Sequence, residues 1–301
     1  MNLVISATGF LGMEICRRLT AASQPVRGLV RKTSDPAKLD ALKTMGVKLA
    51  YGDLREPATL VVACQGVDTV IACATRATDS LPQPGDSIEA TDLQGHLNAI
   101  AAAKATGVRQ YLYVSYSGNM DTGPAPCPLT VAKRTVEAAV RASGMTYTIL
   151  RPSYFMEVWL SPAVGFDYVN AKASIYGQGQ NKISWISLGD VAEFAVQSLS
   201  NPAARNAVIE LGGPQALSPL EVVTLFEQVE GRRFEITNVP VEALQAQQAG
   251  TTDSVMQSFS ALMISYARGD VIDMRQTLQK FPVKLISVRD YVQHVVAPVP
   301  A

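Results

Sequence analysis

A glycine-containing turn near the start of the chain has residue types that suit phosphate binding. An apolar run at residues 3–5 leads into Ser6-Ala7-Thr8-Gly9-Phe10-Leu11-Gly12, and a helical spacing of apolar residues follows. Glycine lets the backbone approach a ligand closely, and the first turn of a helix presents N–H groups without partners. We therefore predict that this turn binds the pyrophosphate of a dinucleotide through Ser6, Thr8, Gly9, Phe10, Leu11 and Gly12. Because Ser6 stands where the three-glycine fingerprint has its first glycine, an ordinary strand-to-helix turn is the alternative.

Two cations follow the second strand-like segment. Arg31-Lys32 stands about twenty residues after the glycine turn, where NAD sites commonly carry an acid that binds the ribose 2′-hydroxyl. A 2′-phosphate needs cations at this place, and a guanidinium binds phosphate through two hydrogen bonds while a lysine adds a point charge. This pair predicts NADP(H) rather than NAD(H). Asp35 is the nearby acid that argues against it, and a solvated basic pair is the alternative.

The elements that position these residues alternate regularly. Strands are predicted near residues 3–5, 25–30, 47–51, 68–73, 111–114 and 147–150, helices near 36–45, 57–64, 88–106 and up to 143, and loops at 75–86 and 118–128. Such crossovers predict a parallel sheet covered by helices on both faces. The predicted fold class is α/β, a doubly wound Rossmann sheet, in which ligands bind at the carboxyl ends of the strands.

The pattern changes after residue 152. Residues 153–185 mix aromatic side chains with glycines, a helix and a strand follow within 186–213, and the remainder to 296 is mostly helical with one strand near 234–236. We predict an NADP-binding domain of residues 1–152, rejoined by 186–213. A smaller substrate lobe, formed by 153–185 and 214–301, is expected over the carboxyl edge of the sheet.

The composition excludes several classes of partner. The 301 residues carry 26 basic and 26 acidic side chains, so no electrostatic footprint for nucleic acid is present. No apolar run reaches the length of a membrane helix and no leader is recognisable, so a cytoplasmic location and a small-molecule ligand are expected. The four cysteines have neither metal-ligand spacing nor the density of a disulfide scaffold. We predict no metal site.

Several segments together resemble the NmrA-like branch of the atypical short-chain dehydrogenases/reductases, which includes isoflavone, quinone and triphenylmethane reductases. The resemblance is carried by the turn from Ser6 to Gly12, Leu29-Val30-Arg31, Gly52-Asp53-Leu54, Gly66-Val67-Asp68, Gly107-Val108, Lys133, Tyr147-Thr148-Ile149-Leu150-Arg151-Pro152 and Ile186-Ser187-Leu188-Gly189-Asp190-Val191-Ala192. It implies an NADP(H)-binding Rossmann domain, a variable substrate lobe, and either reductase chemistry or cofactor sensing without chemistry.

The resemblance also implies further contacts. Asp53 and Leu54 stand where the family contacts the adenine edge, although Asp53 also suits a turn before a helix. Ala74 and Thr75, after the fourth predicted strand, complete the expected cofactor site.

Beyond residue 152, the family lines its substrate pocket where this chain has three aromatic residues. Tyr154, Phe155 and Trp159 would suit a flat apolar substrate, and core packing is an equal alternative. Asp190 resembles a structural residue of the family that caps its helix.

The expected catalytic group is a lysine without its usual tyrosine. Typical members of the superfamily pair Tyr and Lys four residues apart, and the lysine lowers the pKa of the phenol that protonates the substrate. Here Lys133 is present but Leu129 takes the tyrosine position. Lys133 is therefore predicted either to transfer the proton itself or to clamp the nicotinamide ribose, with Ser115 and Tyr116 as candidate groups that orient a carbonyl. A solvated lysine and plain packing are the alternatives.

Two functions remain open. One is an NADPH-dependent reductase of a quinone-like or aromatic carbonyl compound, and the other is a catalytically silent NADP(H)-sensing regulator or assembly protein with a protein partner. Leu129 keeps the second open, and nucleotide-sugar epimerisation would require the absent tyrosine. His96 and His294 are interpreted as packed or surface residues.

Overall fold

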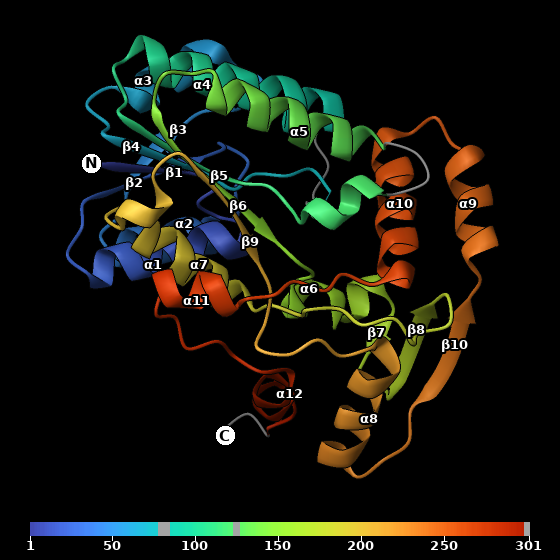
Figure 1. The fold of residues 1–301 in the computed structure, drawn as a ribbon. Coiled ribbons are helices and arrows are strands. Elements are labelled where there is room, and N and C mark those ends of the chain that lie inside the picture. Colours follow the sequence, from blue (N-terminus) through green and yellow to red (C-terminus); the bar gives the residue numbers. More distant parts are fainter. Residues whose placement is uncertain (78–84, 123–126, 298–301) are drawn as a thin grey trace.

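A seven-stranded parallel sheet forms the centre of the protein, seen in the computed structural model of residues 1–77, 85–122 and 127–297 (Figure 1). Its strand order is β3-β2-β1-β4-β5-β6-β9, and every neighbouring pair is parallel. The strands are β1 (Asn2–Ile5), β2 (Val26–Val30), β3 (Lys48–Tyr51), β4 (Thr69–Ala72), β5 (Gln110–Val114), β6 (Thr146–Pro152) and β9 (Ala207–Leu211). The predicted doubly wound α/β fold is confirmed.

Helices cover both faces of this sheet, which explains why β1 and β4 at its centre are largely apolar and fully buried. One face carries α3 (Pro57–Cys64), α4 (His96–Ala105) and α5 (Pro128–Arg141), and the other carries α1 (Phe10–Ala21), α2 (Pro36–Thr44) and α7 (Leu188–Ser198) (Figure 1). All four residues of β1 are buried. Two separate apolar clusters, one on each side, hold the layers together.

A smaller, mostly helical lobe follows the main sheet. A second sheet of order β10-β8-β7 is built from β7 (Phe166–Asp167), β8 (Lys172–Tyr176) and β10 (Glu235–Val239). Around it lie α6 (Met156–Trp159), α8 (Pro219–Glu230), α9 (Val241–Ala249), α10 (Ser254–Arg268) and α12 (Val288–Val296). The strand predicted near 234–236 corresponds to β10. No helix within the described residues is long and apolar enough to span a membrane.

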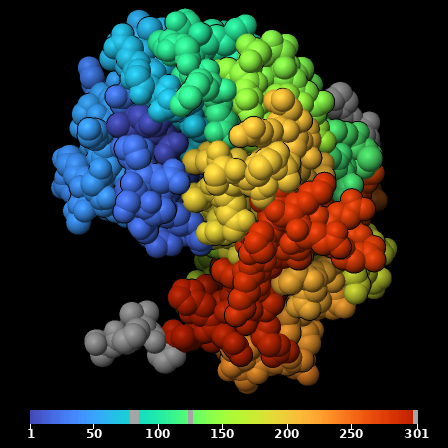
Figure 2. All heavy atoms as spheres, turned by 60° about the vertical axis from the view of Figure 1, so that its left-hand side comes forward, coloured from blue at the N-terminus to red at the C-terminus, as the bar shows by residue number. Residues whose placement is uncertain are grey.

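One C-terminal segment leaves the lobe and returns to the main sheet. Helix α11 (Arg275–Lys280) is flanked by Met274, Phe281 and Val283, which are buried in the cluster on the α1 and α7 side. Figure 2 shows this red segment against the yellow one that contains α7 and β9. The sequence-based division assigns the segment to the smaller lobe, whereas its side chains pack under the larger part.

The long helix predicted at 88–106 is two helices of different type. Residues Ile88–Gly95 form a π-helix, η1, capped by Ser87, whose Oγ accepts from the Ala90 N–H, and α4 continues directly from it. The predicted loops at 75–86 and 118–128 lie partly outside the described residues, and Gly118–Thr122 forms a 3-10 helix, η2.

The expected helix cap at Asp190 is wrong. Ser187 is the N-cap of α7 and its Oγ accepts from the Asp190 N–H. The Asp190 carboxylate instead accepts from the Ile286 N–H at 3.0 Å. It thereby ties the C-terminal segment to α7.

Candidate functional site

The turn after β1 brings an unshielded helix N-terminus to the carboxyl end of the sheet. Ser6 adopts φ +69°, the left-handed conformation that favours glycine, and the Gly9 N–H donates to its carbonyl at 3.0 Å. Gly9 is the N-cap of α1, and neither a capping side chain nor an acidic residue occupies the first turn. The N–H groups of this turn therefore suit an anionic ligand.

The remaining residues of the turn have different environments. A Cβ on Gly12 would lie 2.0 Å from the Ser6 carbonyl oxygen, so glycine is required for α1 to approach β1. Leu11 is buried in the core, Thr8 is half-buried and Phe10 is 73% exposed. Leu11 can therefore offer a ligand only its backbone, whereas Phe10 and, in part, Thr8 are accessible. The predicted roles of all these residues stay predictions.

Charged side chains, most of them in ion pairs, gather at the end of the predicted site where the adenosine would lie. Asp53, after β3, accepts from the backbone N–H and the guanidinium of Arg55, and this hydrogen bonding holds the pKa of its carboxyl below the usual value. Leu54 is buried, and its carbonyl accepts from Asn98. Arg31 is half-buried beside the Asp86 carboxylate, and Lys32 is exposed.

Lys133 lies on α5 in a buried polar cluster under the ends of β4 and β5. Its ammonium is 3.4 Å from the Val114 carbonyl, 3.9 Å from Oδ1 of Asp92 and 5.2 Å from the centre of the Tyr113 ring. His96 completes the cluster, with Nε2 3.0 Å from the Ala74 carbonyl and its ring edge on Tyr113. The π-helix and α4 carry Asp92 and His96 four residues apart, so both reach the same region.

Burial shifts the protonation of this cluster. It lowers the pKa of Lys133, although the nearby Asp92 charge opposes that shift, and it raises the pKa of Asp92. The pKa of His96 is lowered to about 3, first by burial and then by the charge of Lys133, so the imidazole is neutral at physiological pH. Within the described residues, Asp92 Oδ1 and His96 Nδ1 have no hydrogen-bond partner. The Asp92 Oδ2 atom accepts from the Arg76 N–H at 2.8 Å, next to Thr75.

Ser115 and Tyr116 follow β5 but are engaged with other residues of α5. Arg134 donates to Ser115 Oγ at 3.0 Å, and the Tyr116 hydroxyl donates to Thr130 Oγ1 at 2.7 Å. Burial raises the pKa of the Tyr116 phenol. The structure therefore brings the two residues next to α5 without joining either to Lys133, and their catalytic role stays a prediction.

Leu129 fills the place of the usual tyrosine with apolar packing. It is 2% exposed and packs with Ile88, Cys127 and Ala132, while its N–H donates to Ser258 Oγ on α10 at 3.1 Å. The lobe thus closes over the start of α5. No room for a catalytic phenol exists at this position without repacking.

The predicted substrate-pocket aromatics are mainly core residues. Tyr154 and Trp159 are buried in the lobe, where their rings contact each other and Tyr266. Phe155 packs on the cluster under the main sheet. Tyr154 and Trp159 thus belong to the core of the lobe and Phe155 to that of the main sheet, and contact with a substrate stays a prediction.

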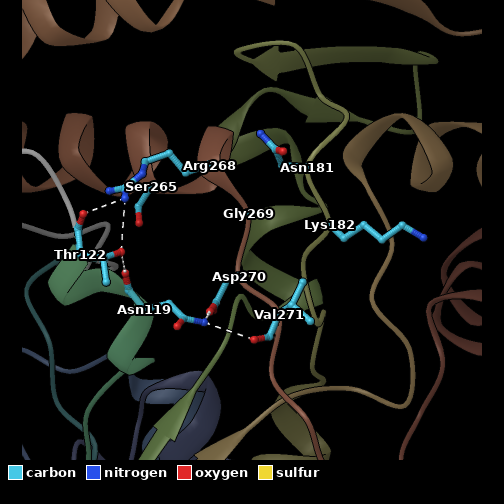
Figure 3. Close-up of a pocket in the computed structure, with 9 residues that line it drawn as sticks. All are labelled: Asn119, Thr122, Asn181, Lys182, Ser265, Arg268, Gly269, Asp270 and Val271. Carbon is cyan, nitrogen blue, oxygen red and sulfur yellow. Dashed lines mark hydrogen bonds between the residues drawn. The ribbon is translucent and has the colours of Figure 1, made fainter.

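A polar pocket of about 360 Å³ lies where η2 meets the end of α10 (Figure 3). Its lining consists of Asn119, Thr122, Asn181, Lys182, Ser265, Arg268, Gly269, Asp270 and Val271. Asp270 accepts from Ser117 Oγ at 2.7 Å and from Asn119 Nδ2 at 2.6 Å, which ties the lobe to the end of β5. None of Tyr154, Phe155 and Trp159 lines this pocket, so it does not bear on their predicted contact with a substrate.

Sequence reasoning missed Asp92, Arg55 and Arg76 as site residues. The i, i+4 spacing of Asp92 and His96 on one long helix was a usable signal, because it predicts one shared face. Arg55 and Arg76 follow β3 and β4, which are not neighbours in the sheet, and only their shared contact with Asp86 brings them together. Within the described ranges, no group of three His, Cys, Asp or Glu residues is placed to hold a metal ion.

The amino-acid sequence is similar to those of a known protein family and of several characterised relatives. Residues 2–285 match the NmrA-like family. An NAD(P)H azoreductase of Xenophilus azovorans is 33% identical over 264 residues, which cover 87% of this chain and 85% of that protein. The photosystem II assembly factor Ycf39 of Guillardia theta is 30% identical over 302 residues, covering 97% and 92%.

The solved structures agree in fold. An NADPH-dependent quinone oxidoreductase of Escherichia coli, crystallised with NADPH, matches with a TM-score of 0.77 and 23% identity, covering 98% of this chain and 99% of that one. Isoflavone reductase matches with a TM-score of 0.76 and 24% identity, covering 98% and 99%. The family match and the shared architecture together lead to one conclusion: the chain belongs to the NmrA-like family.

Proposed function

We propose that the protein binds NADP(H) along the carboxyl edge of the main sheet and uses it as a reductase of small quinone-like or aromatic carbonyl compounds. The observation that carries this proposal is the buried ammonium of Lys133 at the end of β5, on the same sheet edge as the glycine turn. The names of the azoreductase and quinone oxidoreductase relatives support the reductase class.

The residues present fit this cofactor. The open first turn of α1, held close to β1 by Gly12, suits a pyrophosphate. Arg31 and Lys32 would hold the 2′-phosphate, Asp53 and Leu54 the adenine, and Ala74 and Thr75 the middle of the molecule. Asp92 Oδ1 and His96 Nδ1, which lack hydrogen-bond partners among the described residues, lie beside Lys133, where the nicotinamide ribose would need polar neighbours.

The chain's own contribution to the reaction centres on a proton at Lys133 Nζ. Bound NADPH supplies a hydride to the substrate. Because burial lowers the pKa of Lys133, its ammonium gives up a proton more readily than a solvated lysine does. The Asp92 carboxylate keeps the ammonium charged and oriented, and neutral His96 adds no competing charge.

A catalytically silent NADP(H)-binding protein is the second candidate. It is favoured by the packing of Leu129 against α10 and by the engagement of Ser115 and Tyr116 with α5, which leave Lys133 without a phenol partner. The assembly-factor relative supports this class. In this case the polar contacts of Lys133 would only position the cofactor.

A single pair of variants separates the candidates. Lys133→Met is compared with Lys104→Met, because Lys104 is an exposed lysine in the last turn of α4. NADPH binding is measured by titration, and NADPH oxidation is measured with quinones, azo dyes and aldehydes. A reductase gives turnover that falls about 10²-fold or more in Lys133→Met only, with NADPH affinity retained.

Other outcomes have equally clear meanings. Tight NADPH binding without oxidation by any compound supports the silent protein, as does a loss in Lys133→Met that is confined to NADPH binding. Absence of NADPH binding to the folded wild type contradicts both candidates.

A further inference from the structure

Three arginines from three different loops meet around one carboxylate at the carboxyl edge of the main sheet. Asp86 Oδ1 lies 3.1 Å from Nη1 of Arg55, and its Oδ2 lies 3.9 Å from Nη1 of Arg31 and 4.0 Å from Nε of Arg76. The arginines follow β2, β3 and β4, three of the four strands at this end of the sheet order. Each places a guanidinium nitrogen within 4.0 Å of an Asp86 carboxylate oxygen.

The carboxylate at the centre is well shielded from water. Its side chain is 4% exposed, and the side chains of Arg76, Arg55 and Arg31 are 12%, 28% and 35% exposed. Shielding strengthens ion pairs and makes removal of the anion costly unless another anion replaces it. Each guanidinium offers a planar fork of donors that matches phosphate as well as carboxylate.

We propose that Arg31, Arg55 and Arg76 form a binding site for a phosphate monoester, the 2′-phosphate of NADP(H), and that the Asp86 carboxylate fills this site until the phosphate displaces it. The inference rests on the proposed binding of NADP(H). It adds Arg55 and Arg76 to the residues that select the cofactor and assigns Asp86 as an internal competitor. NAD(H) lacks the 2′-phosphate and leaves Asp86 in place.

A phosphate monoester is suited to win this competition. It carries up to two negative charges and three terminal oxygens, whereas the carboxylate carries one charge and two oxygens, and three guanidiniums can each bond a separate phosphate oxygen. Asp53 already binds Arg55 through its Nε and Nη2 atoms, which fixes that guanidinium with Nη1 toward Asp86.

The helix that follows Asp86 is anchored by contacts that do not involve the Asp86 carboxylate. Before Asp86, the chain turns at Gly85, which has φ +80°. The following residues are fixed, because Ser87 caps the π-helix and the Ile88 N–H donates to Ser254 Oγ at 3.3 Å. Exchange of anions is therefore expected to be local to Asp86.

The test compares Asp86→Asn with Asp40→Asn, an exposed acid on α2 that pairs with Lys43. Dissociation constants are measured by calorimetry for NADPH, NADH, adenosine 2′,5′-bisphosphate, 5′-AMP and inorganic phosphate. Asp86→Asn is expected to bind NADPH and the bisphosphate about tenfold more tightly, as loss of one competing ion pair implies, with NADH and 5′-AMP unchanged. Arg76→Gln is expected to weaken the same two ligands selectively.

Several results would overturn the inference. Unchanged NADPH and bisphosphate binding in Asp86→Asn, or an equal gain for NADH, removes Asp86 as a competitor. A gain for inorganic phosphate alone shows a phosphate site that does not serve the cofactor. If Asp86→Asn is unstable, phosphate must raise its melting temperature more than that of the wild type, and failure to do so counts against the site. Bisphosphate binding that responds as expected without any reductase turnover contradicts the reductase and leaves the inference standing.

Discussion

Lys133 on α5 and Asp92 on the π-helix face each other across 3.9 Å, with side chains that are 5% and 0% exposed. The carboxylate raises the pKa of Lys133 while burial lowers it. Neutralising Asp92 removes the opposing effect, so in Asp92→Asn the pKa of Lys133 falls further. If protonated Lys133 is required for turnover, the basic limb of the kcat–pH profile moves to lower pH in this variant. Glu89→Gln, on the exposed side of the same helix, should leave the limb in place, and an unshifted limb in Asp92→Asn would show that the pair does not control the proton.

His96 makes the stability of the fold sensitive to acid. Its pKa is about 3 in the folded protein, against an ordinary value of 6.5 for a solvated histidine, because burial disfavours the charged ring. The unfolded chain therefore binds a proton first, and stability present above pH 6.5 is lost as the pH falls from 6.5 toward 3. We expect a loss of about 2–3 kcal/mol between about pH 6.5 and about pH 4 from this residue, from the roughly 1.36 kcal/mol carried by each pKa unit.

The free energy of unfolding, measured by denaturant titration at several pH values, checks the predicted effect of His96. His96→Gln should flatten the acid side of the stability profile, whereas His294→Gln, at an exposed position in α12, should retain the wild-type slope. Equal slopes in the wild type and His96→Gln would refute the assignment.

Gly12 is expected to be essential for the turn itself. A Cβ at this position would meet the Ser6 carbonyl oxygen at 2.0 Å. Gly12→Ala should lower the free energy of unfolding by about 3 kcal/mol or more, since backbone must move. Gly9→Ala is the comparison, because its Cβ would meet the rotatable Ser6 Oγ at 2.9 Å. Similar thermal melts for the two variants would show that α1 can shift away from β1.

Restoring the superfamily's tyrosine should not restore an acid. Leu129→Tyr places a larger side chain and a hydroxyl into the apolar cluster between α5 and α10, and overpacking of this kind costs about 1–3 kcal/mol. We expect a lower melting temperature and no gain in NADPH oxidation. A stable variant with higher kcat would mean that the phenol reaches the site and that the lobe repacks around it.

Most elements of the fold could be predicted from local patterns of apolar residues in the sequence. The apolar runs at 3–5 and 68–73 became β1 and β4, because both faces of a parallel strand are buried and its composition shows it. The π-helix at Ile88–Gly95 could not be distinguished from an α-helix in the sequence, since its residues have the apolar spacing of an ordinary helix. Strands β7 and β8 were also missed, because two and five residues among glycines give little periodicity.

The parts of the candidate site that lie within short sequence motifs could be predicted from the sequence. The glycine turn and Lys133 each belong to a motif whose residues lie close together in sequence. The grouping of Asp92 with Lys133 depends on two helices packing side by side. That of Arg55 with Arg76 depends on the return of the chain at Asp86 between the loops after β3 and β4. Such contacts join residues that are far apart in the chain and leave no short-range signal.

The return of residues 274–283 to the main sheet has a consequence for synthesis of the protein on the ribosome. Met274, Phe281 and Val283 close the cluster that also contains Ile15 and Leu19 of α1. Because the chain emerges from its N-terminus, this cluster is completed only after almost the entire polypeptide has been made. During that interval the surface of this cluster beside β9, which α11 contacts in the finished fold, is open to chaperones and to other nascent chains. A truncated product ending after β9 would leave that surface uncovered.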